Sequence, residues 1–137
     1  MQQRSIGIDL GCTNIKGVLI DANGTILEQL RQETNEPDDQ HWKNAVSSMI
    51  KSFQSKSSVP VKHIGLSAPG LANSDNTCIS FMPGRLPGLE NFNWSEFTGE
   101  RIFVLNDAHS ALMAEAAFGA AKGMQHAVLL TLGTGVG

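Results

Sequence analysis

Short apolar runs separated by polar turns mark the beginning of the chain. Apolar and polar or small residues alternate at positions 6–10, a second apolar run covers positions 18–20, and a third strand follows the turn at 21–24 and continues over 25–33. A period of two predicts strands with one buried face. The order strand, tight loop, strand, turn, strand predicts an antiparallel β-meander, which differs from the strand–loop–helix of a Rossmann or Walker site.

An amphipathic helix is predicted after the meander. Residues 35–37 break the strand pattern, and Asp38 or Asp39 can cap a helix with acidic charge at its positive end. We expect the polar residues His41 and Lys43 of this helix to lie on the solvated surface. Apolar residues recur at spacings of three and four, which predicts one face packed on the sheet, formed by Trp42, Ala45, Val46, Met49, Ile50 and Phe53.

Strands and helices alternate through the rest of the chain, which indicates an α/β fold. An irregular, loop-rich stretch interrupts this alternation, and long ordered loops are often functional. The pattern predicts, in order, a fourth strand at 61–67, an irregular segment at 71–97 with a short strand at 78–81 and a helical turn at 94–97, a fifth strand at 102–105, an alanine-rich helix at 108–121 and a last strand at 127–132.

Composition narrows the class of protein. With 137 residues the chain has the length of about one domain, and 41% hydrophobic and 17% charged residues are ordinary for a globular protein. The net charge of −3 argues against a nucleic-acid-binding surface. No apolar run reaches transmembrane length and no signal peptide is evident, so we expect a cytoplasmic protein without a membrane partner. Two distant cysteines, Cys12 and Cys78, suggest reduced thiols and no metal pattern.

The loop after the first strand carries groups that suit a nucleotide's phosphates. Gly11 lets backbone N–H groups approach closely, Thr13 and Asn14 add neutral donors, and Lys16 adds positive charge. Asp9 stands where the strand ends, and Mg²⁺ is commonly held by one or two carboxylates together with phosphates and water. The alternative is an ordinary Gly-Asn hairpin whose aspartate caps its own turn.

A second group of candidates follows the fourth and fifth strands. Gly70 ends a sharp turn at a strand's carboxyl end, the edge where ligands bind in open α/β sheets. The alternative, which residue type alone favours, is a rigid Pro-Gly turn with a structural role only. The rigid loop at 83–88 contains one cation, Arg85, which binds substrate or is simply solvated. After the fifth strand, Asn106 and Asp107 form either a helix cap or a general base beside an orienting amide.

The chain ends on a second glycine loop, residues 133–137, directly after the last predicted strand. The Gly-Thr-Gly form of Gly133, Thr134 and Gly135 allows backbone donors to reach a phosphate. Such a loop is weak evidence alone, but two phosphate-type loops with an Asn-Asp pair between them are much stronger. A glycine loop after a strand normally leads into further structure, so we expect the chain to be truncated.

Together these motifs resemble the ROK family of repressors, uncharacterised reading frames and sugar kinases. The resemblance runs nearly end to end. It is carried by the Asp-x-Gly-x-Thr-x-x-Lys motif at 9–16, the Ala-Pro-Gly turn at 68–70, the Leu-Pro-Gly loop at 86–88, the Asn-Asp pair at 106–107 and the Leu-Gly-Thr-Gly-Val-Gly motif at 132–137.

The resemblance implies the N-terminal lobe of an actin-like ATPase (ribonuclease H-like) fold. We expect a mixed five-stranded sheet, an antiparallel β-meander followed by βαβα, with helices on both faces. Residues 1–122 would form this lobe with the sugar loops and the first phosphate loop. Residues 123–137 would supply the first strand and second phosphate loop of a truncated C-terminal lobe.

The resemblance also implies MgATP-dependent phosphorylation of a hexose or N-acetylhexosamine. Asp107 would accept the hydroxyl proton, and Asp9 would position Mg²⁺. The sugar would be held by Asn106, Gly70, Arg85, Pro87 and Gly88. The phosphates would contact Gly11, Thr13, Asn14, Lys16, Gly133, Thr134 and Gly135.

Some expectations concern parts of the family that lie beyond this sequence. Further sugar ligands, a zinc-binding cysteine cluster and the adenosine-binding segment belong to the C-terminal half, so the chain alone is expected to be inactive, and the full-length protein is expected to be a homodimer. Arg85, Leu89 and His109 depart from the family pattern near the sugar. The alternatives are a sugar-responsive transcriptional regulator, disfavoured because the first strand begins near Ser5, and a non-catalytic sugar-binding fragment.

Overall fold

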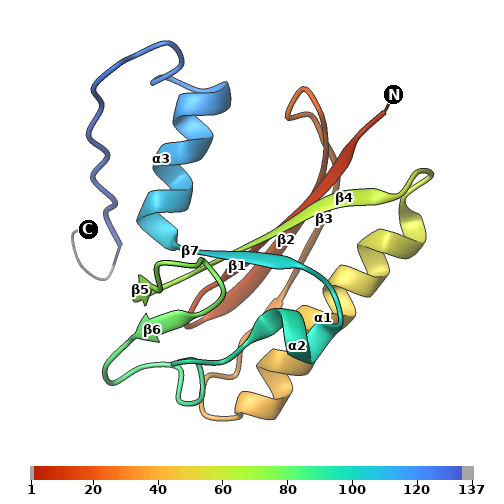
Figure 1. The fold of residues 1–137 in the computed structure, drawn as a ribbon. Coiled ribbons are helices and arrows are strands. Elements are labelled where there is room, and N and C mark those ends of the chain that lie inside the picture. The colour runs from red at the N-terminus through yellow and green to blue at the C-terminus, as the bar shows by residue number, and fades with distance from the viewer. Residues whose placement is uncertain (1, 134–137) are drawn as a thin grey trace.

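The structure, a computed structural model, describes residues 2–133. Strands and helices follow each other nearly as the sequence predicts (Figure 1). The elements are β1 (Arg4–Leu10), β2 (Asn14–Asp21), β3 (Ile26–Glu33), α1 (Asp39–Lys56), β4 (Val61–Ala68), β5 (Leu71–Ala72), β6 (Ile79–Phe81), α2 (Trp94–Thr98), β7 (Ile102–Asn106) and α3 (Asp107–Phe118).

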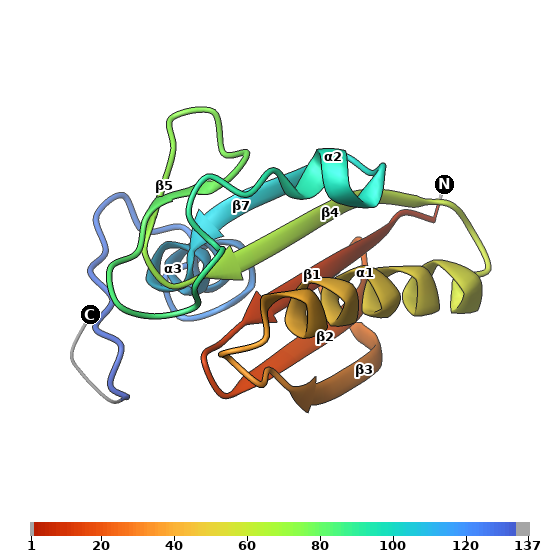
Figure 2. The same ribbon diagram turned by 90° about the horizontal axis from the view of Figure 1, so that it is seen from below.

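A five-stranded mixed sheet forms the centre, in the order β3-β2-β1-β4-β7. The meander β1–β2–β3 pairs antiparallel, whereas β4 pairs parallel with β1, and β7 parallel with β4. Figure 2 shows these strands side by side. The predicted mixed sheet is therefore confirmed. Because β1, β4 and β7 run parallel, their carboxyl ends meet at one edge.

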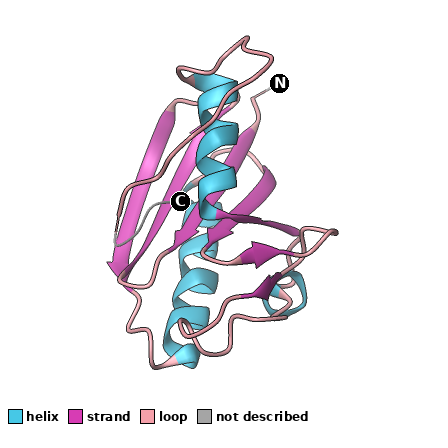
Figure 3. Ribbon diagram, turned by 90° about the vertical axis from the view of Figure 1, so that its left-hand side faces the viewer, coloured by secondary structure: helices cyan, strands magenta, loops and turns pink. Residues whose placement is uncertain are grey.

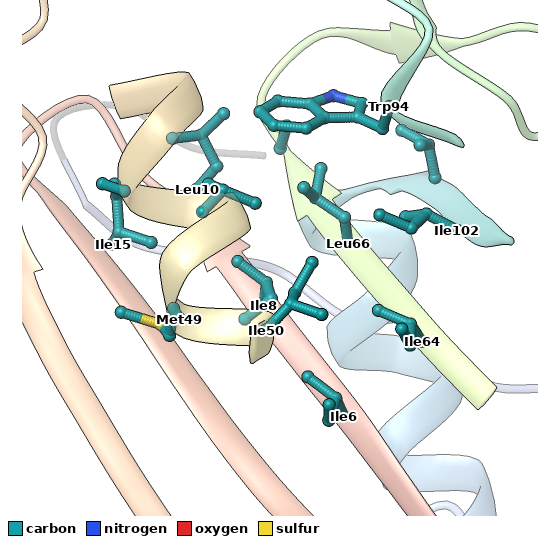
Figure 4. Packing of buried hydrophobic residues seen from close by; sticks show 14 of the residues in the cluster. Ile6, Ile8, Leu10, Ile15, Met49, Ile50, Ile64, Leu66, Trp94 and Ile102 are labelled. Carbon is teal, nitrogen blue, oxygen red and sulfur yellow. The ribbon is translucent and has the colours of Figure 1, made fainter. Parts of the chain in front are cut away.

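The core lies between one face of this sheet and α1. Ile6, Ile8 and Leu10 of β1 are at most 2% exposed, and they point toward α1 (Figure 4). Asp38 caps the helix by accepting a hydrogen bond from the His41 backbone N–H at 3.0 Å. All six apolar residues predicted for the inner face of α1 are buried. The helical periodicity of the sequence thus identified the packed face correctly.

Helix α3 lies on the opposite face of the sheet. Figures 1 and 3 show the strands between α1 and α3, so the prediction of helices on both faces is confirmed. No residue of α3 is buried. The helix ends at Phe118, three residues before the predicted end. Among residues 2–133, no helix has the length and apolar composition needed to cross a membrane.

Lys43 corrects one expectation, because it is buried and not solvated. It is 7% exposed, its Nζ lies 2.8 Å from Asp39 Oδ2, and the same ammonium stands 4.2 Å from the centre of the Phe92 ring. The loop that contains Phe92 folds over the first turns of α1. A surface position on an isolated helix therefore becomes an interior position through a contact between residues distant in sequence.

The last predicted strand is also wrong. Residues 127–131 are extended chain without strand pairing, and only Leu132 makes a single bridge. Val128, Leu130 and Leu132 are 89%, 70% and 81% exposed. A strand requires a neighbouring strand to satisfy its backbone hydrogen bonds. No strand within the described part of the chain pairs along this segment, so its apolar pattern alone does not produce a strand.

Gly17 provides a test of the packing between β2 and α1. A Cβ atom there would lie 2.5 Å from Met49 Sδ and 2.7 Å from Phe53 Cε2, whereas a Cβ on Gly65 would come no closer than 4.0 Å to its nearest neighbour, the Phe103 carbonyl oxygen. We predict that Gly17→Ala lowers the free energy of unfolding by about 1–3 kcal/mol through overpacking. Gly65→Ala is the matched control, with a change below about 0.5 kcal/mol. Urea unfolding measures both, and equal effects of the two variants would contradict this packing.

Candidate active site

The loop between β1 and β2 is a tight backbone turn. The Gly11 backbone N–H donates to the Asn14 carbonyl oxygen at 2.9 Å. A Cβ atom at position 11 would lie 2.8 Å from that oxygen, so the turn favours glycine. The Asp9 carboxylate accepts a hydrogen bond from Ser67 Oγ at 2.8 Å, and among the described residues no N–H of the loop donates to it. The hairpin alternative requires Asp9 to cap its own turn. Asp9 does not do so, which argues against that alternative.

A cavity of about 350 Å³ opens at the carboxyl ends of β1, β4 and β7. It brings together seven residues that the sequence analysis singled out from three distant segments. Pro69 and Cys12 complete the wall. The lining residues are Asp9, Gly11, Cys12, Thr13, Asn14, Lys16, Pro69, Arg85 and Asp107. A carboxylate, two cations and a loop of backbone and side-chain donors thus share one cavity with the proposed general base.

Asn106 and Asp107 form the junction between β7 and α3. Asn106 Oδ1 accepts hydrogen bonds from the backbone N–H groups of Ala108 and His109 at 3.0 and 3.2 Å, so Asn106 is the N-cap of α3. Its Nδ2 donates to the Gly70 carbonyl oxygen at 2.6 Å. The cap interpretation of Asn106 is confirmed, and the same contacts hold the turn after β4 beside Asp107. The sugar-binding role of Asn106 stays a prediction.

The structure does not bring every predicted sugar residue into this cavity. Pro87 and Gly88 line a separate hollow of about 530 Å³ within residues 82–90, and the two hollows share Arg85. Gly88 has a φ of +93°, and a Cβ atom on it would lie 2.8 Å from Asp39 Oδ2 at the start of α1. Gly88 is therefore explained by packing, and its contact with sugar stays untested.

Glu36 is a residue of the site that sequence reasoning missed. Its carboxylate accepts hydrogen bonds from Arg85 Nε at 2.7 Å and Arg85 Nη2 at 2.8 Å, and from the Leu86 backbone N–H at 2.8 Å. The Arg85 hydrogen bonds, followed by that of Leu86, lower the pKa of Glu36 to about 2. The signal available in the sequence was a group of acids after the meander and one cation in the loop at 83–88, which does not single out Glu36.

Cys12 was also missed as part of the wall. Burial raises the pKa of its thiol, with Arg85 opposing and Glu36 and Asp107 adding to the effect. A raised pKa keeps the thiol neutral at physiological pH, so Cys12 contributes shape more than charge.

The second glycine loop is described only at its beginning. Gly133 is exposed and does not line the cavity, and Thr134 and Gly135 lie outside the described residues. Residues 2–133 contain no cluster of three His, Cys, Asp or Glu side chains placed to hold a metal ion. Asp9 is a single carboxylate, which fits Mg²⁺ because this ion keeps several waters and is bound largely through phosphates.

The sequence profile of the ROK family matches residues 5–137. The chain belongs to the ROK family. The glucokinase of Thermotoga maritima is 31% identical, and the match covers 96% of this chain and 42% of the glucokinase. The xylose repressor of Bacillus subtilis is 31% identical, and the match covers 97% of this chain and 36% of the repressor.

A solved structure shows the same fold. The ROK family glucokinase from Streptomyces griseus, in complex with glucose and AMPPNP, superposes with a TM-score of 0.84 at 25% identity, covering 98% of this chain and 43% of the glucokinase chain. This ROK chain is therefore a lobe of the actin-like ATPase fold. It spans less than half the length of each of these three proteins.

The pair formed by Glu36 and Arg85 predicts a pH effect on stability. The pKa of Glu36 lies at about 2 against an ordinary value of 4.5, so its stabilising effect is complete above pH 4.5 and is lost as the pH falls toward 2. We predict that the urea midpoint of the original protein falls more steeply over this range than that of Glu36→Gln. Unfolding curves from pH 6 downward measure the difference. Parallel pH profiles would show that the pair contributes nothing to folding.

Proposed function

We propose that the full-length protein is a sugar kinase that transfers the γ-phosphoryl group of ATP to a hydroxyl of a hexose or N-acetylhexosamine. The observation that carries this proposal is the cavity shared by Asp107 and the loop after β1. A kinase requires an acceptor base and phosphate-binding groups within one small volume. Similarity to glucokinases supports the same reaction.

Each residue of the cavity has a role in this proposal. Asp107 accepts the proton of the attacking sugar hydroxyl. The oxygen of that hydroxyl bonds to the γ-phosphorus, and the bond from this phosphorus to the leaving oxygen of ADP breaks. Thr13 and Asn14 donate hydrogen bonds to the phosphates, and Lys16 balances their charge. Gly11, whose N–H is used within the turn, contributes by letting the loop come close to the phosphates. Asp9 would hold Mg²⁺, which neutralises phosphate charge. Positioning and charge neutralisation are the main requirements of phosphoryl transfer.

The sugar side of the site is less complete. Asn106, which precedes Asp107 in the chain, and Arg85, which lines the same cavity as Asp107, would bind sugar hydroxyls. Gly70, Pro87 and Gly88 would shape the loops around them. We propose that residues 123–137 begin a second lobe, with Gly133, Thr134 and Gly135 on the phosphates. The further lobe would complete the sugar and adenosine sites, carry any structural zinc and support a homodimer. The chain alone would then be inactive.

A sugar-responsive regulator is the second candidate, favoured by the similarity to the xylose repressor. In that protein class the cavity would bind sugar without transferring phosphate. The two candidates differ in turnover and not in sugar binding.

Asp107→Asn provides the decisive variant. We predict that the full-length protein releases ADP in the presence of at least one of glucose, N-acetylglucosamine, N-acetylmannosamine, fructose and allose. We further predict that Asp107→Asn lowers kcat by about a hundredfold to ten-thousandfold, because the amide cannot accept the hydroxyl proton. A coupled ADP-release assay measures both.

The matched control is Asp75→Asn, which makes the same change at an exposed turn outside the cavity and should leave kcat unchanged. A protein that binds one of these sugars but phosphorylates none of them would overturn the kinase proposal and favour the regulator.

A further inference from the structure

Three residues after β3, positions 34–36, contact both loops of the Asp107 cavity. The first contact is with the phosphate loop. Thr34 is fully buried, its backbone N–H donates to the Thr13 carbonyl oxygen at 2.9 Å, and its Oγ1 donates to the Gly11 carbonyl oxygen at 2.7 Å. Both bonds end on carbonyl oxygens of the loop, so Thr34 fixes the path of the loop without using any of the loop's donor groups.

The second contact is with the loop at 82–88. The Glu36 carboxylate holds both the guanidinium of Arg85 and the backbone N–H of Leu86, and the side chain of Leu86 is 1% exposed. The Glu36 carbonyl oxygen accepts a hydrogen bond from Trp42 Nε1 at 3.2 Å, and Trp42 is fully buried in the core. Glu36 thus connects the loop to the core of the lobe.

The backbone between these two contacts adopts a left-handed conformation at Asn35. Its φ of +52° lies in the left-handed region, which asparagine tolerates better than most residues. The Asn35 carbonyl oxygen also accepts a hydrogen bond from the Asp38 backbone N–H at 3.0 Å, next to the cap of α1. A segment of three residues fixed at both ends leaves the two loops little independent movement.

We propose that residues 34–36 are a positioning clip that holds the phosphate loop and the Arg85 loop in a fixed relation, so that donor and acceptor substrates meet correctly at Asp107. This proposal rests on the proposed kinase function. Thr34 and Glu36 are positioning residues, because Thr34 acts through Gly11 and Thr13 and Glu36 acts through Arg85. Reaction rates respond strongly to small misplacements of the reacting groups, so such a clip serves catalysis directly.

The clip predicts that its two ends affect different substrates. Glu36→Gln leaves the guanidinium of Arg85 without its charged partner and should raise KM for the sugar about tenfold, with KM for ATP changed less than about twofold. Thr34→Val removes the hydrogen bond from Oγ1 to the Gly11 carbonyl oxygen and keeps that of the backbone N–H. It should raise KM for ATP several-fold and change KM for the sugar less. A residue needed only for folding would not separate the two KM values in this way.

The experiment is steady-state kinetics of the full-length protein with both substrates varied. The matched control is Glu28→Gln, which breaks the ion pair of Glu28 with Lys56 outside the cavity and should leave both KM values unchanged. Glu36→Gln should add little in an Arg85→Gln background, because Glu36 acts through Arg85. Glu36→Asp is the milder variant, and its shorter carboxylate should give an intermediate KM for the sugar.

The outcomes separate the clip from the kinase function. If the original protein phosphorylates no sugar, the kinase function fails, and calorimetric titration of the same variants with sugar and with an ATP analogue then tests the clip by Kd in place of KM. If the original protein is active but Glu36→Gln raises both KM values equally, or neither, the clip is wrong. Additive effects of Glu36→Gln and Arg85→Gln on KM for the sugar would also overturn it.

Discussion

Strand β1 is the constraint on which the rest of the structure depends. It pairs antiparallel with β2 on one side and parallel with β4 on the other. The antiparallel partner returns the chain through a tight loop, and the parallel partner brings a second loop to the same edge of the sheet. The alternation of side chains along β1 directs Ile6, Ile8 and Leu10 into the core, while Asp9 faces the opposite side beside Ser67. One strand therefore anchors the core and presents the first carboxylate of the site.

The sequence predicted those features that depend on neighbours along the chain. The meander follows from period-two alternation and polar turns, and the inner face of α1 follows from spacings of three and four. The parallel order of β1, β4 and β7 places the loops of the site at one edge, so their common location was also predictable. These are local rules applied to segments whose surroundings agree with them.

The main failures involve partners distant in sequence. Lys43 is buried because the loop with Phe92 covers it. Glu36 belongs to the site through its ion pair with Arg85, and the sequence did not reveal this pair because the two residues are 49 positions apart. The segment at 127–132 has the composition of a strand, but no described strand pairs along it. Side-chain type does not identify such partners, since several acids and cations of the chain would satisfy the same charge rule.

Under the proposed kinase function, the charges of the cavity bear on the form of nucleotide that it would accept. The wall carries Asp9 and Asp107 against Lys16 and Arg85, and the carboxylate of Glu36 already compensates Arg85. Of the two cations in the described wall, Arg85 is paired with a carboxylate, so Lys16 is the one whose charge is left for a ligand. Bare ATP would meet an environment without excess positive charge, which opposes the entry of a polyphosphate. A divalent cation that is bound to the phosphates and coordinated by Asp9 would neutralise part of the phosphate charge. The charge pattern therefore favours MgATP over free ATP.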